Sequence, residues 1–473
     1  MSIGEKPPME FRNHRTKKPK KEMDCSRLIP TEINLDIFSR LSFNHILECK
    51  RVCKNWQRLL LDPCFPRMHL RPSQFQLDDE NRQGNSSYRF SNVNIMSFLF
   101  GCFIEREHIY VYGEYDKSDG QKFNKSITVS KPIPKIMGGM FLGLCDGLVL
   151  CQQPLVFLEN DGQSMDAYVS LVVSNPMTRE YVNLPKFNEP YRHRFMMFGF
   201  GYDSSTNVYK VVRIFYPWHQ KMHDGGSFVG QIYVYTLGCR GSGWRPAGNI
   251  DHHLDEKPGV LANGALHWLG KNKNRILAFD LADEKFREIA APPGLDLSYK
   301  QTSRFSLRVF GGWLCIHHKL NEESLTTDIW VLKKKNTTEN SSCGRSIIGI
   351  IGNQHAAWSW TKEFSMLGYS ESFITYLNPL AITKNGQLLL LQNKCILTRD
   401  EYRRLSISHY SAGLTHELLS DKFFQQSLVR YNPKTEALEK TCDTVMQLPT
   451  VGFPFIKSFL SLKDLGEKEA NKI

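Results

Sequence analysis

The chain has 473 residues, enough for two or three domains of ~150 residues each. Lys and Arg number 60 against 48 Asp and Glu, which gives a formal charge of +12, and 41% of the residues are hydrophobic. These values are typical of globular proteins and exclude a chain that is disordered throughout. The longest apolar runs, 98–103 and 388–391, are far shorter than the ~18 residues of a membrane span.

The first 25 residues are polar and basic and do not resemble a secretory signal. We therefore expect an intracellular protein of the nucleus, the cytoplasm or both, with no membrane partner. In such a compartment the 12 cysteines are expected to be free thiols. Cys49 and Cys53 lie four residues apart, but no Cys-x-x-Cys or nearby His pair completes a metal site. We expect no metal and no cofactor.

Residues 1–24 form a basic tail with too little apolar content to pack, and we expect it to be disordered. One interpretation of its basic run is a nuclear-import signal, and the other is a solvated leader. No nucleic-acid-binding motif follows it, so a nucleic-acid partner is not expected. The run consists of Lys17, Lys18, Lys20 and Lys21.

Residues 26–70 have the pattern of three short helices. Pro30 suits a first helical turn, where its missing N–H costs nothing. Ile33, Ile37 and Leu41 then recur every four residues, as on one apolar face of a helix. Ser42 is expected to end this helix and begin the next.

The second helix carries Leu47, and the third places Val52, Trp56 and Leu60 on one face before Asp62-Pro63 ends it. Three such helices are at the limit of independent stability. Their apolar stripe is also wider than so small a core can cover. The segment therefore predicts a partner protein that covers the remaining apolar surface.

These residues resemble an F-box. The matching stretches are Ile29-Pro30-Thr31-Glu32-Ile33, Ile37-Phe38-Ser39-Arg40-Leu41 and Val52-Cys53-Lys54-Asn55-Trp56. The sequence departs from the family pattern at Ile29, where Leu is usual, and at Ser42-Phe43, where Leu-Pro is common. Both changes keep the volume or the turn character of the position.

Residues 71–89 read as a linker, and residues 90–460 change to short apolar runs separated by Gly, Asn, Asp and Pro, which is typical of an all-β region. Four hairpin turns are predicted at Gly147, Gly264, Gly312 and Gly386, three of them Asp-Gly or Asn-Gly pairs. A second turn signal recurs at Asn175, Asp280, Asp328 and Asn432. Such repeated hairpins predict a β-propeller, and residues 461–473 are expected to be a polar tail.

This region resembles the kelch-like domain that follows many plant F-boxes. The resemblance covers roughly residues 140–440, through stretches such as 173–185, 198–212 and 263–280. The expected fold is therefore multidomain, α plus all-β: a small three-helix F-box followed by a kelch-like β-propeller. The sequence leaves the number of blades open.

We find no catalytic constellation in the sequence. Gly199-x-Gly201 leads into a strand, so a phosphate would lack a helix N-terminus. His252-His253 and His317-His318 are adjacent pairs, whose side chains are expected to point to opposite faces of a strand. The chain is therefore expected to be non-catalytic.

The resemblance implies a substrate-recognition subunit of an SCF-type ubiquitin ligase, which binds a Skp-type adaptor, through it a cullin–RING ligase, and an unknown protein substrate that is ubiquitinated and degraded by the proteasome. Two alternatives stay open: an adaptor-bound scaffold without degradation, and a ligand-binding or enzymatic propeller. Trp56 is the expected anchor of the adaptor interface. The residues expected to contact the adaptor or support its site are Ile29, Pro30, Ile33, Ile37, Leu41, Leu47, Val52, Cys53, Trp56 and Leu60.

Overall fold

The computed structural model describes residues 29–70, 95–104, 107–116, 140–153, 156–160, 164–187, 195–217, 229–239, 243–271, 275–297, 305–310, 312–319, 326–334, 358–367, 373–383, 386–398, 401, 424–443 and 451–472. The basic tail and the linker 71–89 lie outside these residues. The chain divides into two compact units, Met1–Phe65 and Pro66–Ile473. Among the described residues, no helix is long and apolar enough to cross a membrane.

The first unit contains α1 (Thr31–Ser39), α2 (Phe43–Val52) and α3 (Lys54–Leu60), as predicted in number. Pro30 lies just before α1 rather than in its first turn. Ser42 caps α2, because its Oγ accepts a hydrogen bond from the backbone N–H of His45. Val52 is the last residue of α2 rather than part of the third helix, which was a wrong boundary. Cys53 separates the two helices in an extended conformation and caps α3.

A further helix, α4 (Phe65–Leu70), was not predicted. It falls within the predicted F-box range, but from Pro66 onward it belongs to the second unit. Leu70 lies in a buried cluster of the propeller, and an Arg67 Nη2 donates to the carbonyl oxygen of Asn207 at 3.4 Å. The second unit therefore begins inside the segment that the sequence assigned to the F-box.

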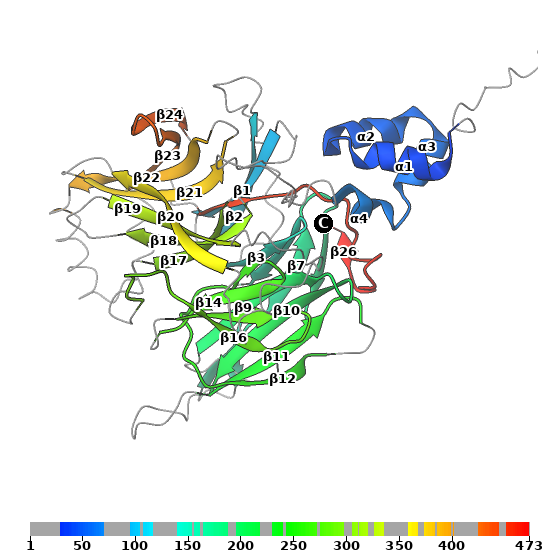
Figure 1. The fold of residues 1–473 in the computed structure, drawn as a ribbon. Helices are drawn as coiled ribbons and strands as arrows, with labels where there is room; N and C mark the ends of the chain where they lie inside the picture. The colour runs from blue at the N-terminus through cyan, green and yellow to red at the C-terminus, as the bar shows by residue number, and fades with distance from the viewer. Residues whose placement is uncertain are drawn as a thin grey trace, which may run out of the picture. The chain divides into compact units, whose positions relative to one another are not determined.

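The second unit is a β-propeller, which confirms the predicted fold class (Figure 1). In the described part of the chain, five blades each contain four strands that follow one another and pair antiparallel. The strands of the five blades are, in order, β3 (Met140–Cys145), β4 (Leu148–Gln152), β7 (Leu171–Asn175) and β8 (Glu180–Asn183); β9 (Phe195–Asp203), β10 (Val208–Tyr216), β11 (Gly230–Thr236) and β12 (Arg245–Ile250); β13 (Val260–Ala262), β14 (Ala265–Leu269), β15 (Arg275–Asp280) and β16 (Phe286–Ala290); β17 (Phe305–Phe310), β18 (Trp313–Lys319), β19 (Thr326–Lys334) and β20 (Trp358–Leu367); β21 (Phe373–Ile382), β22 (Leu388–Thr398), β23 (Phe424–Asn432) and β24 (Ala437–Asp443).

The first strands of neighbouring blades contact one another in the order β3, β9, β13, β17, β21. A three-stranded sheet lies between the last and the first of them, formed by β2 (Glu107–Asp116), β1 (Ile95–Ile104) and β25 (Val451–Pro454). β25 contacts β21, and its Phe453 stacks on Phe141 of β3 with ring centroids 3.9 Å apart. A hairpin of β5 (Val156–Asn160) and β6 (Ser164–Tyr168) is inserted in the first blade.

The predicted hairpin turns are confirmed by their backbone angles. Asp146 and Gly147 have φ of 51° and 81°, and Asn263 and Gly264 have 51° and 77°. Both positions of such a turn need positive φ, which Asn, Asp and Gly adopt at least cost. Each of the four turns joins the first two strands of a blade, after β3, β13, β17 and β21.

The second turn signal is correct at three of its four positions. The side-chain Oδ1 atoms of Asn175, Asp280 and Asn432 each accept a hydrogen bond from the backbone N–H two residues later. Asp328, however, lies inside β19, where its carboxylate accepts hydrogen bonds from Lys362 and Ser365. It is a buried cross-strand partner rather than a turn residue.

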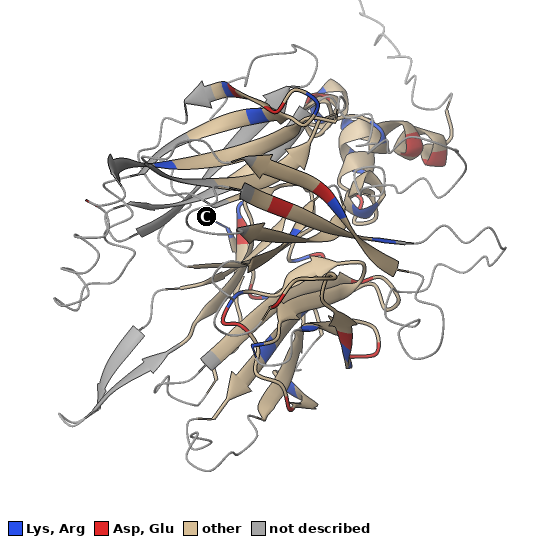
Figure 2. Cartoon of the chain, turned by 60° about the vertical axis from the view of Figure 1, so that its left-hand side comes forward, with Lys and Arg blue, Asp and Glu red and all other residues tan. Residues whose placement is uncertain are grey.

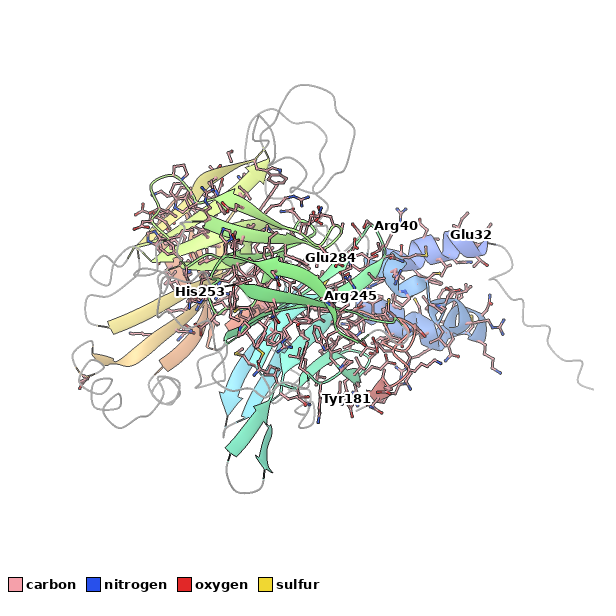
Figure 3. The ribbon with its side chains drawn as sticks, turned by 90° about the horizontal axis from the view of Figure 1, so that it is seen from below. Glu32, Arg40, Tyr181, Arg245, His253 and Glu284 are labelled. Carbon is pink, nitrogen blue, oxygen red and sulfur yellow. The ribbon has the colours of Figure 1, made fainter. Side chains whose placement is uncertain are left out.

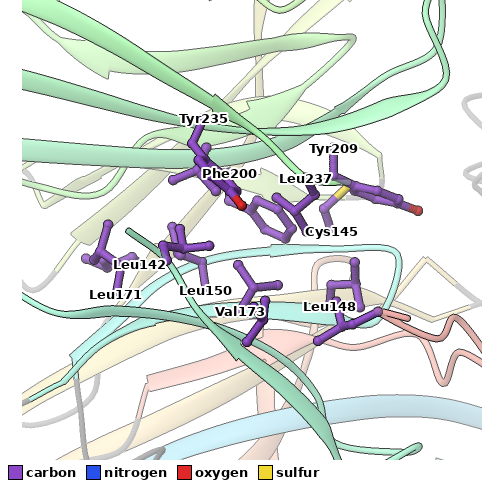
Figure 4. Packing of buried hydrophobic residues seen from close by; sticks show 14 of the residues in the cluster. Leu142, Cys145, Leu148, Leu150, Leu171, Val173, Phe200, Tyr209, Tyr235 and Leu237 are labelled. Atoms are coloured by element: carbon purple, nitrogen blue, oxygen red, sulfur yellow. The ribbon is translucent and has the colours of Figure 1, made fainter. Parts of the chain in front are cut away.

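The propeller core lies between the blades. Figure 4 shows the cluster between the first two, where Leu150 and Val173 of one sheet face Phe200 and Tyr235 of the next. Fully buried strands read as continuous apolar runs rather than as alternation. Leu388–Leu391 of β22 is such a run, with every side chain at 0% exposure.

The expected polar tail 461–473 is instead part of the propeller. Within it, Leu462 is fully buried, Ala470 is 4% exposed, and β26 (Asn471–Lys472) pairs with β8 as a fifth strand of the first blade. The polar side chains that suggested a tail include Glu467, which is 9% exposed and hydrogen bonded to Tyr235 and Gly238. Local composition could not reveal partners more than 200 residues away in sequence.

Candidate partner-binding surface

The first unit carries several exposed large apolar side chains. On α1, Ile33 is 51% exposed and Ile37 is 46% exposed, and they lie one turn apart. Leu47 of α2 is 43% exposed, and Val52 at its end is 63% exposed. We name the apolar surface set the exposed side chains of Ile29, Ile33, Ile37, Leu47 and Val52.

Local hydrogen bonds hold the start of this set in place. The buried Asn34 side-chain amide donates to the carbonyl oxygens of Ile29 at 3.0 Å and Pro30 at 3.3 Å. The chain entering α1 is therefore fixed relative to the helix. Ser39 repeats the arrangement at the other end, where its Oγ donates to the Asp36 carbonyl at 2.7 Å.

A different set of residues makes the small core of the helices. Phe38 is 3% exposed, Ile46 is fully buried and Leu60 is 2% exposed. The rings of Phe38 and Trp56 meet edge to face with centroids 5.0 Å apart, and Trp56 is half-buried. Of the residues predicted for the adaptor site, the structure therefore places Leu60 in the core and Trp56 against it.

The remaining predicted site residues are divided in the same way. Pro30 is exposed and Leu41 is half-buried. Cys53 is exposed, and its Sγ accepts a hydrogen bond from the backbone N–H of Trp56 at 3.4 Å, which caps α3. The sequence could not separate surface from core because Ile37 and Phe38 are adjacent and equally apolar. Asn34 and Ser39 were missed, although their small polar side chains mark the buried face of α1.

Charged residues surround the apolar side chains. Figure 3 labels Glu32 near the start of α1 and Arg40 just after its end, and Arg40 forms an exposed ion pair with Asp36 at 2.7 Å. Lys50 is half-buried, and burial lowers the pKa of its ammonium group. α2 and α3 also present exposed Arg51, Lys54 and Arg58. Exposed charges of both signs therefore surround the apolar side chains, as at the polar rim of many protein interfaces.

A buried charged cluster of the propeller has a structural explanation. Lys210 on β10 is 5% exposed and contacts Asp203 at 3.0 Å and Glu284 at 2.9 Å. Arg245 also binds Glu284, and Figure 3 labels both of these residues. Burial would raise the pKa of Asp203, but hydrogen bonds from Ser205, Thr206 and Lys210 hold it well below its usual range. The cluster joins the second blade to the third.

The histidine pairs are positioned as parts of the scaffold. His317 and His318 lie in β18, as expected, and the His318 ring stacks on Phe305 at 4.3 Å. His252 and His253 follow β12 in a loop, so the predicted strand placement was wrong for them. His252 contacts Asp251 at 2.7 Å and Glu288 at 2.9 Å. Among the described residues, no group of three or more His, Cys, Asp or Glu side chains could hold a metal ion.

The charges of the described strands and helices are interspersed, with Lys and Arg next to Asp and Glu (Figure 2). Among the described residues, the apolar surface set is a group of large side chains that a partner protein could cover. The fold defines the class of protein: a short helical module followed by a β-propeller.

Comparisons with known proteins agree with this class. Residues 27–70 match the F-box-like family, and residues 110–368 match the F-box associated beta propeller domain. The chain belongs to the family of F-box proteins with an F-box associated β-propeller. Its relatives include F-box protein At3g07870 of Arabidopsis thaliana, which is 25% identical over 83% of this chain and 87% of the relative.

Two further Arabidopsis thaliana relatives match this chain over most of their length. Putative F-box protein At1g53550 is 26% identical over 81% of this chain and 82% of its own. F-box protein CPR1 is 24% identical over 77% of this chain and 79% of its own. The resemblance found in the sequence is therefore confirmed for both parts of the chain.

Proposed function

We propose that this chain is a substrate receptor of an SCF-type ubiquitin ligase, in which α1–α3 bind a Skp-type adaptor and the propeller binds a target protein. The observation that carries the proposal is the apolar surface set, whose five large side chains are 42–63% exposed. Covering such side chains with apolar partner atoms gains about 25 cal/mol per Å² of area removed from water. In the F-box family, a surface of this kind is expected to bind an adaptor.

The mechanism is one of proximity. A receptor that holds the target beside a ubiquitin-charged enzyme raises the effective concentration of target lysines. No catalytic side chain is required in the receptor for this role. The chain is proposed to be non-catalytic on this ground, and the compartment in which it acts is proposed to be the nucleus, the cytoplasm or both.

The test is co-expression with a Skp-type adaptor followed by size-exclusion chromatography of wild type and Ile37→Asp. Ile37 is exposed in the free chain, so the variant is expected to fold, but a partner would bury the new carboxylate without a counter-charge. We expect the wild type to co-elute with the adaptor and the variant to elute alone. The matched control is Met140→Asp on the propeller, because Met140 is 47% exposed and also apolar.

Three outcomes would contradict part of the proposal. Wild type that elutes apart from the adaptor while its β-strands are folded would exclude adaptor binding. Loss of co-elution with Met140→Asp would show that the effect is not specific to α1. If the complex forms but no ubiquitinated partner accumulates when the proteasome is blocked, the chain is an adaptor-bound scaffold instead.

A further inference from the structure

The segment that follows β25 runs along the ends of the first two blades. We call residues 455–472 the strap. It has little regular structure apart from β26, yet Ser458 and Leu462 are fully buried and Leu460 is 3% exposed. A Cβ at Gly147, in the turn of the first blade, would lie 2.5 Å from the carbonyl oxygen of Ile456. The strap and this turn are therefore in close backbone contact.

Asn175 fastens the middle of the strap. It is the last residue of β7, and its side chain is fully buried. The Nδ2 group donates to the carbonyl oxygens of Ser458 at 3.1 Å and Leu460 at 2.7 Å, while Oδ1 accepts from Met177 N–H at 2.9 Å. The amide thus satisfies the turn and two strap carbonyls together. Without the Asn175 side chain, the carbonyl oxygens of Ser458 and Leu460 would each lose a hydrogen-bond donor.

Two buried carboxylates fasten the remainder. Glu180 of β8, 5% exposed, accepts from the Leu462 N–H at 2.7 Å and the Ser461 Oγ at 3.2 Å. Glu467 of the strap accepts from the Tyr235 hydroxyl at 3.1 Å and from the Gly238 N–H at 2.8 Å. One carboxylate thus belongs to the first blade, and the other reaches the second. Charge-assisted hydrogen bonds of this kind are stronger than neutral ones.

The same strap packs against α4. The ring of Phe459 meets the ring of His69 edge to face at 5.4 Å, and His69 is 5% exposed. Leu70 belongs to the same buried cluster as Leu460 and Leu462. α4 has only six residues, and a helix so short is not stable without packing. Strap side chains provide this packing together with the first two blades.

We infer that the strap is a positioning element, which holds α4 in place on the first two blades of the propeller. This packing is made by parts distant in sequence, so it depends on the complete strap. The inference concerns α4 within the second unit and does not rest on the proposed function, so the two can be tested separately.

The experiment uses the full chain with Phe459→Ala, which removes the ring against His69 but leaves Asn175, Glu180 and Glu467 in place. Amide hydrogen exchange is followed at 66–70 and at β8, together with trypsin cleavage after Arg67. We expect exchange at 66–70 to rise at least about tenfold, with β8 unchanged, because α4 opens locally. Tyr235→Phe is the matched control, since it removes the hydrogen bond from the Tyr235 hydroxyl to Glu467 of the strap but leaves the ring and the Phe459–His69 contact in place.

Unchanged exchange at 66–70 in Phe459→Ala, or an equal rise in Tyr235→Phe, would overturn the inference. If Phe459→Ala fails to fold, His69→Ala tests the same contact from the α4 side with the strap intact. Binding to a Skp-type adaptor is measured in parallel and is expected to be unchanged in every variant. Wild type that does not bind the adaptor would refute the proposed function, whereas the exchange data would still decide the inference.

Discussion

The helices and the blades use the same kinds of side chain in opposite ways. Ile33 and Ile37 of α1 are about half exposed, whereas Leu388–Leu391 of β22 are completely buried. Each blade has a neighbour on both faces, so it can bury a continuous apolar run. The helices bury Phe38, Ile46 and Leu60, whereas Ile33, Ile37, Leu47 and Val52 stay exposed. The comparison teaches that the propeller buries its apolar runs within its own fold, while the helical module leaves large apolar side chains exposed, as expected of a module near the limit of independent stability.

The largest loss of folding stability is expected from a substitution in the buried charged cluster of the propeller. Asp203→Ala removes a carboxylate that pairs with Lys210 and accepts from Ser205 and Thr206. Removing one partner of a buried ion pair typically costs about 3–5 kcal/mol. We expect a loss in the lower part of this range, because Glu284 still pairs with Lys210 at 2.9 Å. Denaturant unfolding monitored on the propeller measures the loss. The control is Asp283→Ala, whose pair with Arg287 is partly exposed, and a loss of equal size there would contradict the explanation.

A loss of similar kind but confined to the helices is expected from Phe38→Ala. Phe38 is 3% exposed and packs against Trp56, so the substitution empties much of a very small core. We expect a cost of about 3 kcal/mol, at the low end for a buried Phe, because so small a module can partly collapse. Hydrogen exchange at α1–α3 should rise while exchange in the blades stays the same. A rise in the blades would show that the two units do not unfold independently.

We expect the folding stability of the propeller to fall at acidic pH because of one buried histidine. Burial lowers the pKa of His267 from 6.5 to about 4. Between pH 6.5 and 4 the His267 side chain is therefore protonated in the unfolded chain but neutral in the folded chain. The contribution of His267 to the free energy of unfolding is complete above pH 6.5 and is lost as the pH falls toward 4. The slope should be about 1.4 kcal/mol per pH unit in that window. His267→Leu is expected to flatten it, and an unchanged slope would assign the acid effect to other groups.

The smallest effect on folding stability is expected in the apolar surface set. Ile33→Ala removes a side chain that is 51% exposed, so the free chain should change in stability by less than about 0.5 kcal/mol. Adaptor affinity, measured by calorimetry, should fall much further than stability does. A large loss of folding stability would mean that Ile33 already packs within the chain.

Some features could be predicted from the sequence because their causes are local. The Asp146-Gly147 and Asn263-Gly264 turns follow from the positive φ that those residues tolerate, and Asn175 follows from its bond to the N–H two residues later. The exposed face of α1 was visible as a four-residue repeat. Whether Trp56 faces the partner or the core could not be read, since an apolar stripe has the same period in both cases.

Other features depend on partners that are distant in sequence. The strap was interpreted as a tail because its charged residues are common in tails, and nothing near Glu467 in sequence reveals Tyr235 or Gly238. Asp328 was interpreted as a turn by analogy with Asp280, although in the fold its partners Lys362 and Ser365 make it a strand residue. Val52 was assigned to the wrong helix because the extended residue Cys53 interrupts two equally apolar segments.

The strap also affects when the first blade can be completed during synthesis of this chain. The Asn175 side chain can donate to the carbonyl oxygen of Ser458 only after 283 further residues have been translated. At about 5–20 residues per second, translation takes roughly 15–60 s to cover that distance. During this interval the first blade has its own four strands but lacks the partner that completes them. A ribosome that stalls before the strap therefore leaves a propeller with an unfinished first blade, and chaperones can recognise such a chain by the apolar surface it still exposes.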